Sequence, residues 1–148
     1  MYMHWQRTFL HPMLANFDAP MRDECTASRT VSNTPQQALT LLNDPTFVEA
    51  ARVFAERLLK LDVAGDDARL NAAMELAAGR ALNGEERASL TYFLNSQREQ
   101  FKSAPEDAAK VVKAGLSPAV TGLDTVEIAA WTSVARVMLN LQETITRY

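Results

Sequence analysis

Two helix starts stand close together in the chain and limit what it can fold into. Thr34-Pro35-Gln36-Gln37 combines a capping residue, proline at the first helical position and glutamine three residues after the cap, which is a capping-box pattern. Asp44-Pro45 repeats the combination with an acidic cap. The first start predicts a helix over about residues 35–43. Helices shorter than ~12 residues are marginal alone in water, so we expect this one to dock on another part of the structure.

The stretch from Pro45 to about Leu61 predicts an amphipathic helix, because its apolar residues recur at spacings of three and four. The apolar stripe is Phe47, Ala51, Phe54, Leu58 and Leu61. The charged residues on the opposite side are expected to face water: Glu49, Arg52, Glu56 and Lys60. Glu56 precedes Lys60 by four residues, a spacing that favours an ion pair on a helix surface.

Three more helices follow from start and stop signals. The first comes after a turn at residues 63–67 and loosens at Gly79, and the second starts at Asn83-Gly-Glu-Glu86. The buried stripe of the second is Leu90, Phe93, Leu94, Gln97 and Phe101. Pro105 starts a short third helix that Gly115 closes in a left-handed conformation, before a loop over residues 117–122.

The last segment, about Leu123 to Thr146, is predicted to be the longest and most apolar helix. One stripe is Trp131, Val134, Met138, Leu141 and Ile145, and a second side carries Ile128, Ala135 and Leu139. Two apolar sides indicate a central helix that is contacted from two directions. Since no strand pattern or fixed-period repeat occurs, the predicted fold class is all-α, an irregular helical bundle of about five to six helices with a long N-terminal loop region.

The N-terminal part lacks this periodicity. Tyr2, Trp5, Phe9 and Leu10 could share one face of a short helix that ends at His11-Pro12, and turn-forming residues dominate from Met13 to Asn33. Long loops of this kind are functional or pack on another part of a protein. We expect a single helical domain, with a loop-rich segment over residues 1–33 and a bundle over residues 34–148, that forms the C-terminal part of a larger domain.

Composition excludes several classes of function. The chain has 148 residues, 47% hydrophobic and 22% charged, which is typical of one globular domain. Its net charge is −3 and its lysines and arginines are dispersed, so we expect no nucleic acid partner. No apolar run reaches the ~20 residues of a membrane span, and the N-terminus shows no secretory signal pattern.

Residues with reactive side chains are few. Cys25 is the only cysteine, and its acidic neighbours Asp23 and Glu24 disfavour a reactive thiolate. His4 and His11 lack the further ligands of a metal or haem site, so we expect no metal and no cofactor in this chain.

Four residues of the loop-rich segment are the weak candidates for a binding or catalytic site. Asp18 and Asp23, or Glu24 in place of Asp23, could form a carboxylate pair. Arg22 and Arg29 could clamp an anion. A solvated or salt-bridged loop is the simpler interpretation, because nothing in the sequence fixes the separation of these groups. The chain therefore carries no catalytic signature.

Three blocks of this sequence resemble a known family. They are FDAP at residues 17–20 with Cys25 after it, SNTPQQALTLLNDPTFVEAAR at residues 32–52, and EIAAWTSVARVMLNLQETITR at residues 127–147. Together with AAGRALNGEE at residues 77–86, they are similar to the C-terminal part of the planctomycete domain of unknown function 1553. This is the PSD-one domain of planctomycete cytochrome-c-associated proteins.

The resemblance implies a context rather than an activity. Members of this family are typically large exported proteins in which another domain often carries a haem, so the parent protein is expected to be periplasmic or secreted. The chain itself shows neither an export signal nor a haem attachment motif, and we expect it to be a fragment or a truncated member.

Two hypotheses about function follow. In the first, the chain is a helical accessory or interaction module whose partner is the N-terminal part of the parent protein or another protein. In the second, Asp18, Arg22, Asp23 and Arg29 contribute to an active site for polysaccharide breakdown or redox chemistry, completed by a missing N-terminal region. Convergence of the four side chains in a pocket would favour the second hypothesis.

Overall fold

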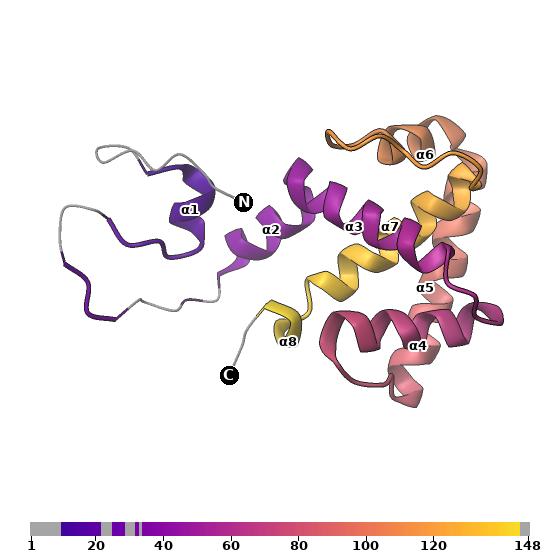
Figure 1. Ribbon diagram of the computed structural model, residues 1–148, viewed down its shortest axis with the longest axis horizontal. Helices are drawn as coiled ribbons and strands as arrows, with labels where there is room; N and C mark the ends of the chain where they lie inside the picture. Colours follow the sequence, from indigo (N-terminus) through magenta and orange to yellow (C-terminus); the bar gives the residue numbers. More distant parts are fainter. Residues whose placement is uncertain (1–9, 22–24, 29–31, 33, 146–148) are drawn as a thin grey trace. The chain divides into compact units, whose positions relative to one another are not determined.

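The structure is a computed structural model that describes residues 10–21, 25–28, 32 and 34–145. Among these residues it contains helices and no strand, which confirms the all-α prediction (Figure 1). The helices are α1 (Pro12–Asn16), α2 (Pro35–Asn43), α3 (Pro45–Leu59), α4 (Gly65–Ala78), α5 (Gly84–Ser103), α6 (Pro105–Val112), α7 (Thr125–Leu139) and α8 (Gln142–Ile145).

The chain divides into two compact units, residues 1–41 and 42–148, which we call the N-terminal unit and the C-terminal unit. The boundary falls inside α2, between Leu41 and Leu42. The expected division into a loop-rich segment and a bundle within a single domain, itself part of a larger one, stays a prediction.

The predicted starts of α2, α3 and α5 are confirmed, whereas α4 begins at Gly65, inside the predicted turn at residues 63–67, and has no side-chain cap. The backbone N–H of Thr34 donates to Gln37 Oε1 at 3.2 Å and that of Gln37 donates to Thr34 Oγ1 at 3.4 Å, which completes the capping box of α2. Asp44 accepts the backbone N–H of Thr46 at the start of α3. Asn83 and Glu86 form the same reciprocal cap as the first pair at the start of α5.

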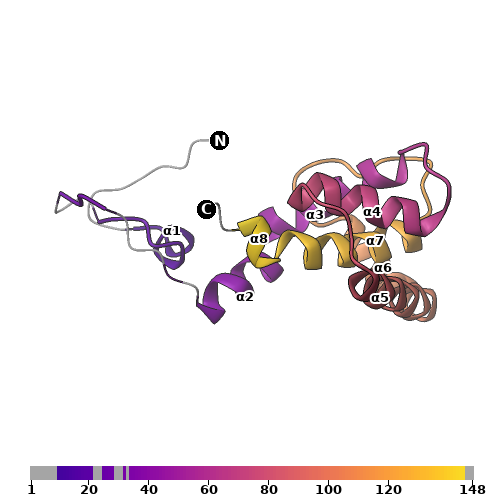
Figure 2. The same cartoon turned by 90° about the horizontal axis from the view of Figure 1, so that it is seen from below.

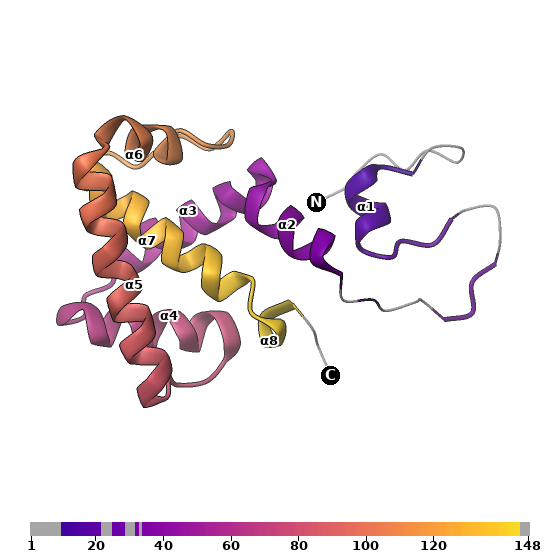
Figure 3. The same ribbon diagram turned by 180° about the vertical axis from the view of Figure 1, so that it is seen from behind.

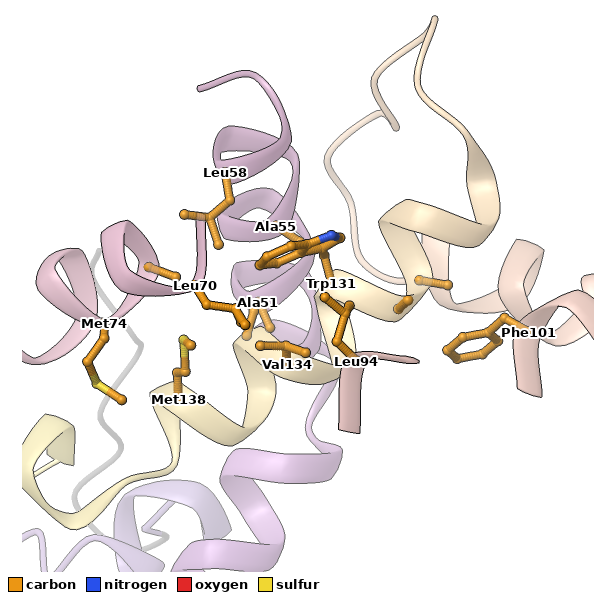
Figure 4. Packing of buried hydrophobic residues seen from close by; sticks show 14 of the residues in the cluster. Ala51, Ala55, Leu58, Leu70, Met74, Leu94, Phe101, Trp131, Val134 and Met138 are labelled. Atoms are coloured by element: carbon orange, nitrogen blue, oxygen red, sulfur yellow. The ribbon is translucent and has the colours of Figure 1, made fainter. Parts of the chain in front are cut away.

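The core of the C-terminal unit forms around α7, which contacts α3, α4, α5, α6 and α8. Trp131 is fully buried on α7 and lies against α3 beside Ala55 (Figure 4). Ile128, Val134 and Met138 of the same helix are also buried. The helix is therefore the central one, as the two apolar sides of its sequence predict.

The predicted length of the last helix was wrong. Instead of running unbroken to Thr146, α7 ends at Leu139 and α8 begins at Gln142. Asn140, a weak helix former, stands at the break, and the Thr144 hydroxyl donates to the carbonyl of Met138 at 3.0 Å. The longest helix is instead α5, with 20 residues. Thr146 lies outside the described residues.

The N-terminal unit contains a helix that was not predicted. Residues 12–16 form α1, and His11 caps it by accepting the backbone N–H of Met13 at 3.3 Å. His11-Pro12 therefore begins a helical turn, in keeping with the preference of proline for the first helical position. Tyr2, Trp5 and Phe9 lie outside the described residues.

Arginines join the helices of the C-terminal unit. Arg98 on α5 binds Asp66 of α4 at 2.5 Å and Glu127 of α7 at 2.8 Å, and this pairing lowers the pKa of Asp66 (Figure 3 shows α5 and α7 from behind). Arg80 binds both Glu86 and Glu143 at 2.6 Å, and its hydrogen bonds lower the pKa of Glu86 to about 2. Charge-assisted bonds of this kind fix helix positions as well as adding stability.

Candidate functional site

Asp18 is the centre of a hydrogen-bond network in the N-terminal unit. Its Oδ2 accepts the backbone N–H of Ser32 at 2.8 Å, the Ser32 hydroxyl at 2.7 Å and the amide of Gln37 at 3.4 Å. The Gln37 amide also donates to Ser32 Oγ at 3.1 Å. One carboxylate thereby connects the turn after α1 to the start of α2.

The network joins two blocks that are separated in the sequence. The FDAP block supplies Asp18, and the block that begins at Ser32 supplies Ser32 and Gln37. Gln37 is the only buried residue among the described residues of the N-terminal unit. These blocks therefore meet in a polar cluster that positions the backbone.

The electrostatics of Asp18 favour a structural role over proton transfer. Hydrogen bonds from Ser32 and Gln37 stabilise the charged form and lower the pKa of Asp18. A general acid at neutral pH needs the opposite shift. Asp18 also has a positive φ of 55°, a left-handed conformation that aspartate tolerates better than most residues.

The other predicted site residues cannot be placed beside it. Arg22, Asp23 and Arg29 lie outside the described residues, so their convergence with Asp18 stays a prediction. His4 lies outside them too, and Cys25 is exposed. Within the part of the chain that the structure describes, no cluster of three or more His, Cys, Asp or Glu side chains could hold a metal ion.

A second polar cluster lies in the C-terminal unit, where α3 holds the loop that follows α6 (Figure 2). Arg52 is fully buried and donates to the carbonyls of Ala114 at 3.3 Å and Ser117 at 2.8 Å, and to the Glu56 carboxylate at 2.5 Å. Glu49 accepts the backbone N–H groups of Leu116 at 3.0 Å and Ser117 at 2.6 Å. We call these three α3 side chains and the bonds they make the loop clamp.

The loop clamp corrects one prediction about α3. Arg52 and Glu56 were expected to face water, but their exposed fractions are 0% and 4%. Glu56 pairs with Arg52 rather than with Lys60. The reason is that the loop after α6 covers this side of α3. Its backbone carbonyls accept hydrogen bonds from the N–H groups of Arg52 that Glu56 does not bind, which an apolar covering could not do.

Gly115 lets the loop approach α3 closely. Its φ is +94°, as the predicted left-handed conformation requires, although α6 ends earlier, at Val112. A Cβ at this position would lie 2.3 Å from Glu49 Oε2, closer than any real contact. The neighbouring Leu116 is 99% exposed even though its backbone N–H is held by Glu49.

Sequence reasoning missed the loop clamp because its spacings are typical of a solvated helix face as well. Arg52 and Glu56 stand four residues apart, a spacing common among surface ion pairs. The one usable signal was Gly115, which indicates an unusual backbone but not the helix that it approaches.

These features define an all-helical protein whose described polar clusters hold loops and helix ends in place. Residues 1–94 match the family PSD1, a protein of unknown function (DUF1553), and the chain belongs to this family. The match includes the Asp18 network and the loop clamp residues of α3, whereas α6, α7 and α8 lie beyond it. The resemblance of residues 127–147 and the placement at the C-terminal end of the domain therefore stay expectations.

No curated protein and no solved structure matches the chain. Among the described residues, none of the helices has the length and apolar character that crossing a membrane requires.

Proposed function

We propose that the chain is a helical interaction module of a larger exported protein, and that residues 10–41 pack against another part of that protein. The observation that carries this proposal is the contrast in burial. All described apolar residues that are fully buried belong to the C-terminal unit, whereas the described residues of the N-terminal unit bury only Gln37. Described residues that bury no apolar side chain among themselves can gain apolar burial by packing on a partner surface.

One exposed apolar side chain of the N-terminal unit supports the same proposal. Met21 is 71% exposed, directly after the FDAP block. Single exposed apolar residues are common, but here the exposed residue belongs to a unit that is held by hydrogen bonds. Met21 is therefore a natural contact for the partner.

The location and cofactors are proposed from the family resemblance. An exported parent protein would place the chain in the periplasm or outside the cell. A haem would then belong to another domain of the parent protein, and the chain itself would bind no cofactor and no nucleic acid.

A share in an active site is less well supported. Its candidate acid, Asp18, accepts three hydrogen bonds on one oxygen and has a lowered pKa. Those bonds suit a residue that positions a loop, so the interaction module is the better account.

Hydrogen exchange tests the proposal directly. The chain is measured alone and after mixing with the region that precedes it in a longer family member. We expect the backbone amides of residues 10–41 to gain protection on mixing, while those of α5 stay unchanged. No gain in protection on mixing would overturn the proposal.

A matched pair of variants guards against nonspecific association. Met21→Ser removes the exposed side chain of the N-terminal unit, and Tyr92→Ser removes a side chain on α5 that is 78% exposed. We expect Met21→Ser to reduce the protection gained on mixing and Tyr92→Ser to leave it unchanged. Equal effects of the two variants would contradict a specific surface.

A further inference from the structure

Leu116 is presented to solvent by a fixed backbone. Its 99% exposure would be unremarkable on a loose loop, but both residues 116 and 117 donate their N–H groups to Glu49. Arg52 holds the carbonyls on either side, at Ala114 and Ser117. Hydrogen bonds within the protein already order this loop. A partner that contacts Leu116 therefore binds with a smaller loss of conformational entropy.

An open groove of about 470 Å³ lies on the same side of α3. Its lining residues are Val53, Glu56, Arg57, Lys60, Leu61 and Val120. Val120 comes from the loop that contains Leu116, and Val53 lies one helical turn from Glu49, the residue that holds Leu116. The groove and the exposed leucine therefore belong to one continuous face.

The lining of the groove carries a net positive charge, because it contains Arg57 and Lys60 against the single carboxylate of Glu56. Glu56 is paired with the buried Arg52, so its charge is compensated inside the protein. Arg57 and Lys60 are exposed, and no carboxylate of the described residues forms an ion pair with either. Two free cations beside apolar side chains complement a segment that combines acidic and apolar residues.

We propose that the face formed by α3 and the loop at residues 113–122 binds an acidic peptide segment of a partner protein that also carries apolar side chains. The apolar side chains of the segment occupy the groove over Val53 and Val120, and its carboxylates pair with Arg57 and Lys60. Leu116 packs against the segment at the end of the groove. This rests on the proposed function as an interaction module, but it assigns a surface separate from residues 10–41.

The test is selection from a displayed library of random peptides on the complete chain, with depletion on the Leu116→Ser variant. We expect the retained peptides to be rich in Asp and Glu interspersed with Leu, Ile, Phe or Trp. A retained peptide is then made with a fluorescent label and titrated by anisotropy. Failure to retain any peptide, or retention of basic peptides, overturns the proposal.

Variants locate the binding on this face. Leu116→Ser and the double variant Arg57→Glu with Lys60→Glu should each weaken binding by about tenfold or more, as expected for central contacts. Leu76→Ser, which alters a side chain on α4 that is 47% exposed, should leave binding unchanged. Circular dichroism of each variant checks that the fold is kept. Equal binding by all variants would show that the peptide uses another surface.

The outcome is separable from that of the proposed function. If selection fails while residues 10–41 gain protection with the preceding region, the interaction module stands and only this surface is withdrawn. If selection succeeds while those residues do not gain protection, the chain binds a partner through α3 rather than through its N-terminal unit.

Discussion

The two units of this chain reach order by opposite means. In the N-terminal unit a single carboxylate, that of Asp18, joins the turn after α1 to the start of α2, and the only buried residue described there is polar. In the C-terminal unit a fully buried tryptophan lies on a central helix that five others contact. Apolar burial stabilises roughly in proportion to area, whereas a hydrogen bond adds only about 0.5–1.5 kcal/mol net. The second unit should therefore dominate the measured stability.

The largest effect is expected from Trp131→Ala. Removal of a fully buried aromatic ring from the core should reduce the free energy of unfolding by about 3–5 kcal/mol. Urea unfolding followed by circular dichroism measures it. Tyr92→Ala, at an exposed position on α5, should change stability by less than about 0.5 kcal/mol. If the two variants were equally stable, apolar burial in the C-terminal unit would not dominate the stability of the chain.

Arg52→Met should follow, with a loss of about 3 kcal/mol, because Glu56 would stay buried without its partner. The double variant Arg52→Met with Glu56→Leu should recover much of this loss, since two apolar side chains leave no buried charge. The same urea titration measures both. A double variant no more stable than the single one would mean that the bonds of Arg52 to the loop, rather than to Glu56, hold this region.

Two glycines separate backbone strain from close packing. Gly122 has a φ of +91° with open space around it, so Gly122→Ala should cost only the strain of the backbone, about 1 kcal/mol. Gly115 has a similar φ, but a Cβ there would meet Glu49. Gly115→Ala should therefore destabilise the chain more than Gly122→Ala in thermal unfolding. Equal losses would show that the loop moves away from α3 without cost.

The smallest effect on overall stability is expected from Asp18→Asn. The variant should lower the hydrogen-exchange protection of the backbone amides of Ser32, which donates to Asp18, and of Gln37, whose side chain donates to the same carboxylate. It should leave the urea midpoint unchanged. Asp107→Asn, at an exposed site on α6, is the matched control and should alter neither amide. A shift of the urea midpoint for Asp18→Asn would show that the network supports more than the N-terminal unit.

The pH dependence of the same amides carries a definite sign. Because the folded-state pKa of Asp18 is lowered from 3.8, its stabilising contribution is complete above that value and is lost as the pH falls through the folded pKa. Protection of Ser32, corrected for the intrinsic exchange rate, should therefore decline only under acidic conditions. In Asp18→Asn this decline should be absent.

Much of the fold could be predicted from local signals. Capping residues and prolines act within a few residues of a helix start, so the starts of α2, α3 and α5 follow from Thr34, Asp44 and Asn83. The central position of α7 follows from its two apolar sides. The break before α8 could not be predicted, because the apolar spacing continues through Leu141, and only the hydrogen bonds at Asn140 and Thr144 show where the helix ends.

The polar clusters were much harder to predict, since each depends on contacts between distant residues. Arg52 meets carbonyls more than sixty residues further along the chain, and Asp18 meets Ser32, which stands 14 residues after it. A helical pattern gives the face on which a charged residue lies. It does not give the segment that covers that face.

The two bonding roles of Gln37 constrain how the sequence can vary. Glutamate would serve a capping box as well as glutamine does. However, the Gln37 amide also donates to Asp18 and Ser32, which a carboxylate cannot do at neutral pH. Gln37→Glu would set two negative charges against each other, and a compensating change such as Asp18→Asn would relieve the repulsion. In chains descended from a common ancestor, these two positions should therefore change together rather than singly.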